Sequence, residues 1–134
     1  MTFETESTTT RQIRVFICDD VAEVRLLVRT ALDHDPDVFV VGEAADGTSA
    51  LEGIAASNPD VVVLDLAMPH ADGLQVLREL RAREEPIRVV VFSGFGAPGM
   101  SEAVRDLGAA CFIPKGSPLT ELRDAILDVP AAAA

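Results

Sequence analysis

Residues 61–65 read VVVLD, a run of four apolar residues that ends directly in a carboxylate. The same arrangement, an apolar run followed by a polar side chain, recurs in RVFICDD at 14–20, in VVVFS at 89–93 and in CFIPK at 111–115. Runs that are apolar on successive residues, rather than on alternate ones, are typical of parallel strands covered on both faces. The sequence therefore predicts a parallel sheet whose central strands are buried.

The polar residues that follow these runs are Asp19, Asp20, Asp65, Ser93 and Lys115. The carboxyl ends of parallel strands meet at one edge of a sheet, and ligands bind there in open α/β folds. Two carboxylates about 5 Å apart repel by roughly 3 kcal/mol at an effective dielectric of 20, so a purely structural role explains such a cluster poorly. We expect this edge to bind a divalent cation and a phosphoryl group.

Segments with helical periodicity separate the apolar runs. The expected strands are 13–18, 38–44, 61–65, 88–92 and 110–114, and the expected helices are 21–33, 48–57, 72–83, 98–107 and 118–129. Strands that alternate with helices in this way indicate an α/β fold, with a doubly wound parallel sheet of five strands and helices on both faces.

Apolar stripes and capping residues place these helices. The stripe of the first helix has the 3.6-residue period and consists of Val24, Leu27, Val28, Ala31 and Leu32. The helix starts are predicted from three capping signals, which are Asp20 with Glu23, Ser49 with Glu52, and Ser117 followed by Pro118.

The length of 134 residues suits a single domain, which we place at 13–129 with flexible tails at 1–12 and 130–134. The net charge of −11 argues against direct binding to nucleic acid or to an anionic membrane by this chain, because like charges repel. The sequence contains no apolar run of membrane-spanning length and no apolar core of a signal peptide near Met1, so we expect a cytoplasmic protein.

The cysteines and histidines show no metal-binding pattern. Cys18 and Cys111 lie inside predicted strands without the spacing of a metal or redox pair, and we expect both to be small buried apolar residues. His34 and His70 have no second histidine or cysteine at ligand spacing, so we expect them at the surface or in loops.

The residues at the expected sheet edge suit phosphoryl chemistry. Mg²⁺ prefers oxygen ligands, which Asp19, Asp20 and Asp65 supply together with a backbone carbonyl just after Asp65. Asp65, on the central strand, is the best placed nucleophile for an aspartyl phosphate, while Lys115 and Ser93 suit contacts with phosphoryl oxygens. Taken singly, Asp20 fits a helix cap equally well, and Asp65 and Ser93 fit turn positions.

Four motifs occur in order along the chain, and they are CDD at 18–20, VVVLDLAMPHADGLQVL at 61–77, VVVFSG at 89–94 and CFIPKGSP at 111–118. With these motifs the chain resembles, over about residues 13–129, the receiver domain of a two-component response regulator. The resemblance implies a flavodoxin-like (βα)5 fold with strand order 2-1-3-4-5. It also implies a signalling phosphoacceptor rather than a turnover enzyme.

The resemblance assigns a role to each residue of the expected site. It implies that Asp65 is the phosphoacceptor, that Asp19, Asp20, Asp65 and the carbonyl of Ala67 hold Mg²⁺, and that Lys115 contacts the phosphoryl group. The donor in such domains is the phosphohistidine of a sensor histidine kinase. The receiver itself supplies most of the catalysis of transfer and later hydrolyses its own acyl phosphate.

The resemblance also implies a conformational switch at Ser93 and Phe112. The aromatic residue has no hydroxyl group, so its readout would be steric, and Gly116 follows the lysine where many relatives have proline, which excludes a cis-proline there. The switch would change the 98–129 face and through it a homodimer, an output protein, or a DNA-binding domain of the helix-turn-helix type. The chain is then either a stand-alone receiver or one part of a longer protein.

Other functions fit the residues less well. A phosphatase of the haloacid dehalogenase type would need a second aspartate two positions after its nucleophile, where Ala67 stands. A docking domain that is never phosphorylated has no need of the full set of acids, hydroxyl and lysine. A flavin-binding protein would need a phosphate-binding loop rich in Ser, Thr or Gly after the first strand, and the sequence has none.

Overall fold

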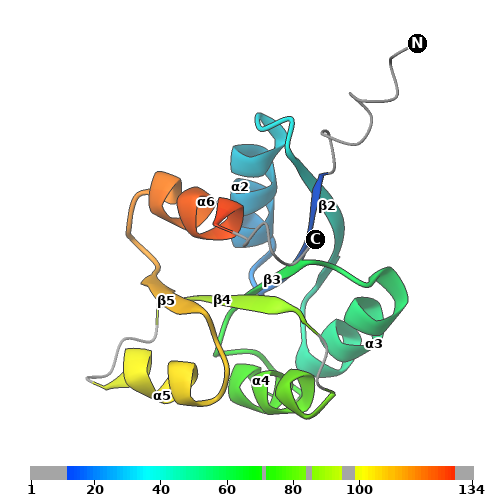
Figure 1. Ribbon diagram of the computed structural model, residues 1–134, viewed down its shortest axis with the longest axis vertical. Coiled ribbons are helices and arrows are strands. Elements are labelled where there is room, and N and C mark those ends of the chain that lie inside the picture. Colours follow the sequence, from blue (N-terminus) through cyan, green and yellow to red (C-terminus); the bar gives the residue numbers. More distant parts are fainter. Residues whose placement is uncertain (1–11, 71, 84–85, 95–98, 129–134) are drawn as a thin grey trace.

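The computed structural model of the protein describes residues 12–70, 72–83, 86–94 and 99–128. At its centre lies a parallel sheet of five strands in the order β2-β1-β3-β4-β5, as predicted (Figure 1). The strands are β1 (Ile13–Cys18), β2 (Val38–Ala44), β3 (Val61–Leu64), β4 (Arg88–Ser93) and β5 (Cys111–Pro114). Strand order reverses between β1 and β3, and the carboxyl ends of these two strands therefore border a crevice.

Helices cover both faces of the sheet (Figure 1). One face carries α2 (Ala22–Asp33) and α6 (Leu119–Leu127). The other face carries α3 (Gly47–Ser57), α4 (Gly73–Ala82) and α5 (Met100–Asp106). The prediction of a doubly wound α/β fold is confirmed.

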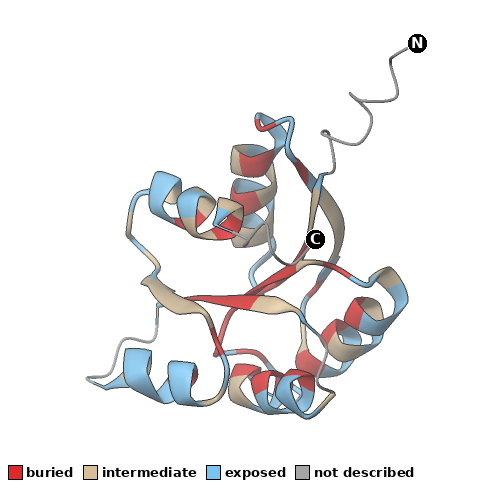
Figure 2. Cartoon of the chain, in the orientation of Figure 1, coloured by how far each residue is buried: buried red, intermediate tan, exposed pale blue. Residues whose placement is uncertain are grey.

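The core has two halves, one on each side of the sheet. Along β1, Val15 and Ile17 pack with the α2 and α6 side, while Phe16 and Cys18 pack with the side of α3, α4 and α5. All four residues of β3 are buried, and Figure 2 shows buried positions concentrated along the central strands. This burial explains why the central runs are apolar on successive residues.

The helix starts differ from their predicted positions. The N-cap of α2 is Val21 rather than Asp20, and it makes no side-chain capping bond. The N-cap of α3 is Asp46, whose side chain accepts a 2.8 Å hydrogen bond from the N–H of Ser49, so Ser49 lies inside the helix rather than capping it. That hydrogen bond also lowers the pKa of Asp46. The N-cap of α6 is Pro118 rather than the predicted Ser117, so this helix begins one residue later than expected.

Two predictions of burial were wrong. Leu27 is 52% exposed, because α2 packs on the sheet through the narrower row that contains Val28 and Leu32. Cys111 is only half-buried, since β5 is an edge strand and a hollow of about 590 Å³ opens beside it and Arg88 at the amino ends of β4 and β5. Cys18, in contrast, is buried as expected.

The predicted tails lie almost wholly outside the described residues, as do the first residue of the helix expected at 98–107 and the last residue of the helix expected at 118–129. Both histidines are exposed as expected, and His70 has a positive φ of 51°. No described helix has the length and the apolar character needed to cross a membrane.

The start of α4 lies against the backbone that follows β3. Gly73 donates its N–H to the carbonyl of Leu66 at 3.0 Å. A Cβ atom at Gly73 would lie 2.3 Å from the carbonyl oxygen of Asp65 and 2.5 Å from the Cα of Leu66. Both contacts are with backbone atoms, which cannot move aside as a flexible side chain can. Only a glycine at position 73 lets α4 pack this closely on the backbone of Asp65 and Leu66.

We expect Gly73→Ala to lower the free energy of unfolding by about 1–3 kcal/mol, because the added methyl group overpacks the backbone at Asp65. Urea denaturation followed by circular dichroism measures this change. Gly94→Ala is the matched control, since its Cβ would meet only the Lys115 side chain at 3.9 Å. Equal stability of the two variants would contradict this account of the packing.

Candidate functional site

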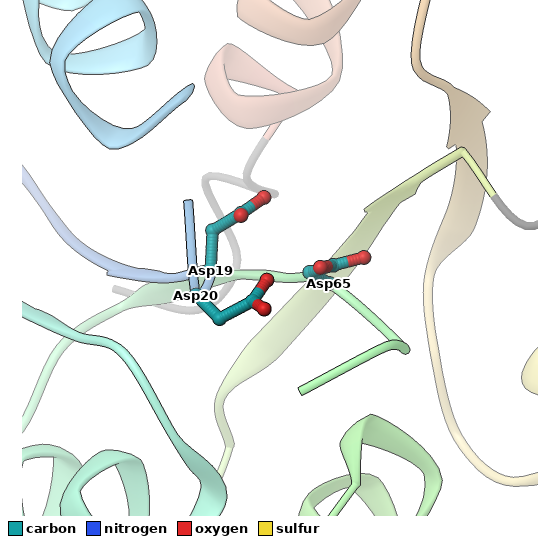
Figure 3. Close-up of side chains that lie close together, drawn as sticks. All are labelled: Asp19, Asp20 and Asp65. Carbon is teal, nitrogen blue, oxygen red and sulfur yellow. The ribbon is translucent and has the colours of Figure 1, made fainter. Parts of the chain in front are cut away.

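Three carboxylates meet at the carboxyl ends of β1 and β3 (Figure 3). Asp19 and Asp20 directly follow β1, and Asp65 directly follows β3. One oxygen from each of the three lies within 4.8 Å of the other two. Asp19 and Asp65 are buried, with 2% and 3% of their surface exposed, whereas Asp20 is exposed. The cluster therefore has two buried members and one that faces solvent.

A lysine and a serine from the neighbouring strands contact these acids. Nζ of Lys115, just after β5, lies 2.7 Å from Oδ2 of Asp19 and 3.5 Å from Oδ2 of Asp65. The Oγ of Ser93, the last residue of β4, donates a 2.9 Å hydrogen bond to Oδ1 of Asp65. The residues predicted to converge at this edge therefore lie together.

Backbone hydrogen bonds extend the sheet into the site. The N–H of Asp65 donates to the carbonyl of Cys18 at 2.9 Å, and the N–H of Lys115 donates to the carbonyl of Ser93, also at 2.9 Å. The N–H of Asp19 donates to the carbonyl of Ala44 at 3.0 Å. Asp19, Asp65 and Lys115 are thus held by the same parallel pairing that holds the strand before each of them.

Burial raises the pKa of Asp65 above its ordinary value, because the ionised carboxylate loses solvation inside the fold. The hydrogen bond from Ser93 opposes this effect, since it stabilises the ionised form. The neighbouring charge of Asp19 raises the pKa of Asp65 further, and the charge of Lys115 lowers it. The net shift is upward, so the site favours a ligand that neutralises Asp65.

The acid cluster fits a magnesium ion. Carboxylate oxygens are the ligands that Mg²⁺ prefers, and three of them lie within 4.8 Å of one another. Lys115 is the cation that contacts Asp19 and Asp65, and the exposure of Asp20 leaves the cluster open on one side. Each pair of like charges at such separations costs about 3 kcal/mol at an effective dielectric of 20, and a divalent cation would remove that cost.

The site opens into a shallow pocket of about 330 Å³. Its lining residues are Asp20, Val21, Asp65, Ala67, Ser93, Gly94 and Lys115. Ala67 is exposed, and its N–H donates a long 3.4 Å hydrogen bond to Oδ1 of Asp65. The pocket is open to solvent and large enough for a phosphoryl group.

Phe112 lies away from the pocket. It pairs with Val91 in the sheet, is half-buried, and packs against the core on the side of α3, α4 and α5. Gly116, just after the lysine, has a φ of 100°, a conformation that favours glycine. No described peptide bond is cis.

Sequence reasoning missed two residues that hold the site in place. Gly73 allows the close approach of α4 to Asp65, and Arg25 donates a 2.6 Å hydrogen bond from Nη1 to the carbonyl of Asp19. The glycine lies inside a quoted motif, but a backbone contact eight residues away leaves no periodic signal. Arg25 lies six residues after Asp19, where an arginine on a helix is ordinarily interpreted as a solvated charge.

The chain is similar to known proteins over most of its length. Residues 15–127 match the response regulator receiver domain family. The chain is 43% identical over 117 residues to the probable transcriptional regulatory protein NarL of Mycobacterium tuberculosis, covering 87% of this chain and 54% of that protein. It is also 43% identical over 114 residues to a protein-glutamate methylesterase/protein-glutamine glutaminase of Moorella thermoacetica, covering 84% of this chain and 27% of that protein.

Solved structures show the same fold. The signal receiver domain of the putative response regulator NarL from Mycobacterium tuberculosis superposes with a TM-score of 0.83 at 42% identity, covering 88% of this chain and 95% of that one. The response regulator domain of Thermotoga maritima CheB superposes with a TM-score of 0.82 at 32% identity, covering 89% and 96%.

The chain spans only about a quarter to a half of the length of the first curated relatives that it matches. Those relatives carry different names, since one is a probable transcriptional regulatory protein and others are protein-glutamate methylesterases/protein-glutamine glutaminases. The shared part is the receiver, and its family accounts for the five-stranded fold and the acidic cluster described above. This chain therefore belongs to the receiver domain family of two-component response regulators.

Proposed function

We propose that Asp65 is the phosphoacceptor of this receiver domain, and that it takes a phosphoryl group from the phosphohistidine of a sensor histidine kinase. The observation that carries the proposal is the meeting of three carboxylates with one hydroxyl and one ammonium group around Asp65. In the transfer, the P–N bond to histidine breaks and a P–O bond forms at a carboxylate oxygen of Asp65. Water later takes the phosphoryl group from Asp65, which releases inorganic phosphate and regenerates the carboxylate.

The other residues have separate tasks in this proposal. Asp19, Asp20 and Asp65, with the backbone carbonyl of Ala67, would hold Mg²⁺, which would supply positive charge beside the transferred phosphoryl group. Lys115, now 2.7 Å from Asp19, turns its charge toward a phosphoryl oxygen. The domain thus catalyses its own phosphorylation and dephosphorylation, and it acts as a signalling device rather than as a turnover enzyme.

The proposed output is a conformational switch at Ser93 and Phe112. Ser93 donates to Asp65, so a phosphoryl group on Asp65 would compete for the same hydroxyl. A shift of Ser93 would leave space for the half-buried ring of Phe112 on the adjacent strand. Moving a two-state equilibrium from 1:99 to 99:1 requires about 5.5 kcal/mol of differential stabilisation, within reach of a few charge-assisted hydrogen bonds.

The downstream partner belongs to this proposal as well. The similarity to NarL supports transcription regulation through an attached or separate output domain, and the similarity to methylesterases supports an enzymatic output. The face formed by residues 98–129 is our candidate for homodimer formation. With its net charge of −11, this chain is expected to leave DNA contact to the output domain, and we place the protein in the cytoplasm.

We expect incubation with Mg²⁺ and acetyl phosphate to add one labile phosphoryl group, and Asp65→Asn to abolish it. The amide of asparagine keeps the shape of the side chain but lacks the nucleophilic carboxylate. Intact mass spectrometry measures the adduct, which should also disappear when a chelator removes Mg²⁺.

Asp72→Asn is the matched control for this experiment. Asp72 is an exposed aspartate that caps α4, and asparagine caps helices equally well, so this variant should be phosphorylated like the wild type. An adduct that persists in Asp65→Asn would refute the assignment of the phosphoacceptor. A protein that binds Mg²⁺ but forms no adduct would favour a docking domain that works without phosphorylation.

Lys115→Ala should keep Mg²⁺ binding but uncouple phosphorylation from the switch. Removing the ammonium group 2.7 Å from Asp19 relieves competition for that carboxylate, so we expect affinity for Mg²⁺ to be equal or higher in isothermal titration calorimetry. Phosphorylation should no longer shift the backbone amide resonances of Ser93 and Phe112. A loss of affinity of more than about tenfold, or 1.4 kcal/mol, would contradict this role.

A further inference from the structure

The connection between β1 and α2 carries two of the three acids, and its backbone is held at Asp19. The N–H of Asp19 donates to the carbonyl of Ala44 at 3.0 Å, which ties the connection to the end of β2. The carbonyl of Asp19 accepts a 2.6 Å hydrogen bond from Nη1 of Arg25, in the first turns of α2. Both hydrogen-bonding groups of the Asp19 backbone are therefore used, one by the sheet and one by the helix.

Asp20 depends on this backbone more than Asp19 does. The Asp19 carboxylate is held directly, by the N–H of Val21 at 2.9 Å and by Nζ of Lys115 at 2.7 Å. Asp20 is exposed, and no described residue forms a hydrogen bond or ion pair with its carboxylate. The peptide unit that carries the Asp19 carbonyl also contains the nitrogen of Asp20. Arg25 therefore fixes the peptide plane from which the Asp20 side chain extends.

Arg25 is itself held by a carboxylate from β2. Its Nε donates to Oε1 of Glu43 at 3.1 Å, and only 19% of the Arg25 side chain is exposed. The other oxygen of Glu43 accepts from Nε of Arg29 at 2.7 Å. Arg29 also lies on α2 and also pairs with Glu43, but it is Arg25 that donates a hydrogen bond to the carbonyl of Asp19.

We propose that Arg25 is a positioning residue for the magnesium site, acting through the Asp19 carbonyl to hold Asp19 and Asp20 in place for the ion. This inference rests on the proposed function, since it takes Mg²⁺ as the ligand of the acid cluster. A positioning role and a purely electrostatic role predict opposite changes in Mg²⁺ affinity when Arg25 is removed. The positive charge of Arg25 alone would repel Mg²⁺, so its removal would tighten binding, whereas the loss of a positioning contact weakens binding.

The test is the dissociation constant of Mg²⁺ for the whole chain, measured by isothermal titration calorimetry without any phosphodonor. We expect Arg25→Ala to bind Mg²⁺ about tenfold or more weakly than the wild type, the usual range for residues that orient metal ligands. Backbone amide spectra should show altered resonances of Asp20 and Val21 before Mg²⁺ is added. Thermal unfolding of each variant fixes a working temperature at which all of them are folded.

Arg29→Ala is the matched control. It removes the same charge from the same helix and breaks a pair with the same glutamate, but it leaves the bond from Arg25 to the Asp19 carbonyl. We expect its affinity for Mg²⁺ to stay near that of the wild type. Arg25→Lys keeps the charge but loses the two separated nitrogens with which Arg25 contacts Glu43 and the Asp19 carbonyl, so it should show a smaller loss of affinity. It serves as the test if Arg25→Ala does not fold.

The outcomes separate this inference from the proposed function. If the wild type binds Mg²⁺ and the two Arg25 variants bind it equally well or more tightly, Arg25 has no positioning role. Equal weakening by Arg29→Ala would also overturn the inference, because the effect would then come from the lost pairing with Glu43 or from the stability of α2 rather than from the contact with the Asp19 carbonyl. A wild type that binds no Mg²⁺ would overturn the proposed magnesium site and the inference together.

Discussion

Repulsion between carboxylates at one sheet edge is the constraint on which the rest of the structure depends. Asp19, Asp20 and Asp65 bring their oxygens within 4.8 Å of one another, and two of them are buried. Left alone, such a cluster would push the ends of β1 and β3 apart. The fold opposes this with the ammonium group of Lys115, which bridges Asp19 and Asp65. The ammonium group of Lys115 thus neutralises part of the negative charge that a bound divalent cation would also neutralise.

The sheet provides the rigidity that this arrangement needs. Backbone hydrogen bonds from Asp65 to Cys18 and from Lys115 to Ser93 continue the parallel ladder beyond the last strand residues. Because β3 is buried on both faces, the position of Asp65 is set by packing on two sides at once. Gly73 adds a third constraint, since it brings α4 against the backbone of Asp65. A rigid site keeps the carboxylates preorganised for a ligand despite their repulsion.

Much of the fold could be predicted from the sequence because its signals are local. The uninterrupted runs before Asp19, Asp65, Ser93 and Lys115 identify buried parallel strands, and the order of the strands within the sheet follows from the family that the motifs resemble. The predictions of helix starts failed where two nearby residues could both cap the helix and only one of them does. At the start of α3, for example, an aspartate three residues before Ser49 caps the helix instead.

The sequence by itself determined which elements form and which polar residues end them, because apolar periodicity and strand-end positions are properties of short segments. Only the tertiary structure decided three contacts. Lys115 forms an ion pair with Asp19, Arg25 donates a hydrogen bond to the Asp19 carbonyl, and the backbone beside Gly73 leaves no space for a methyl group. Each of these contacts joins elements that are adjacent only after the sheet is paired and its helices are packed. Their distances depend on side-chain direction and strand register, which no local pattern encodes.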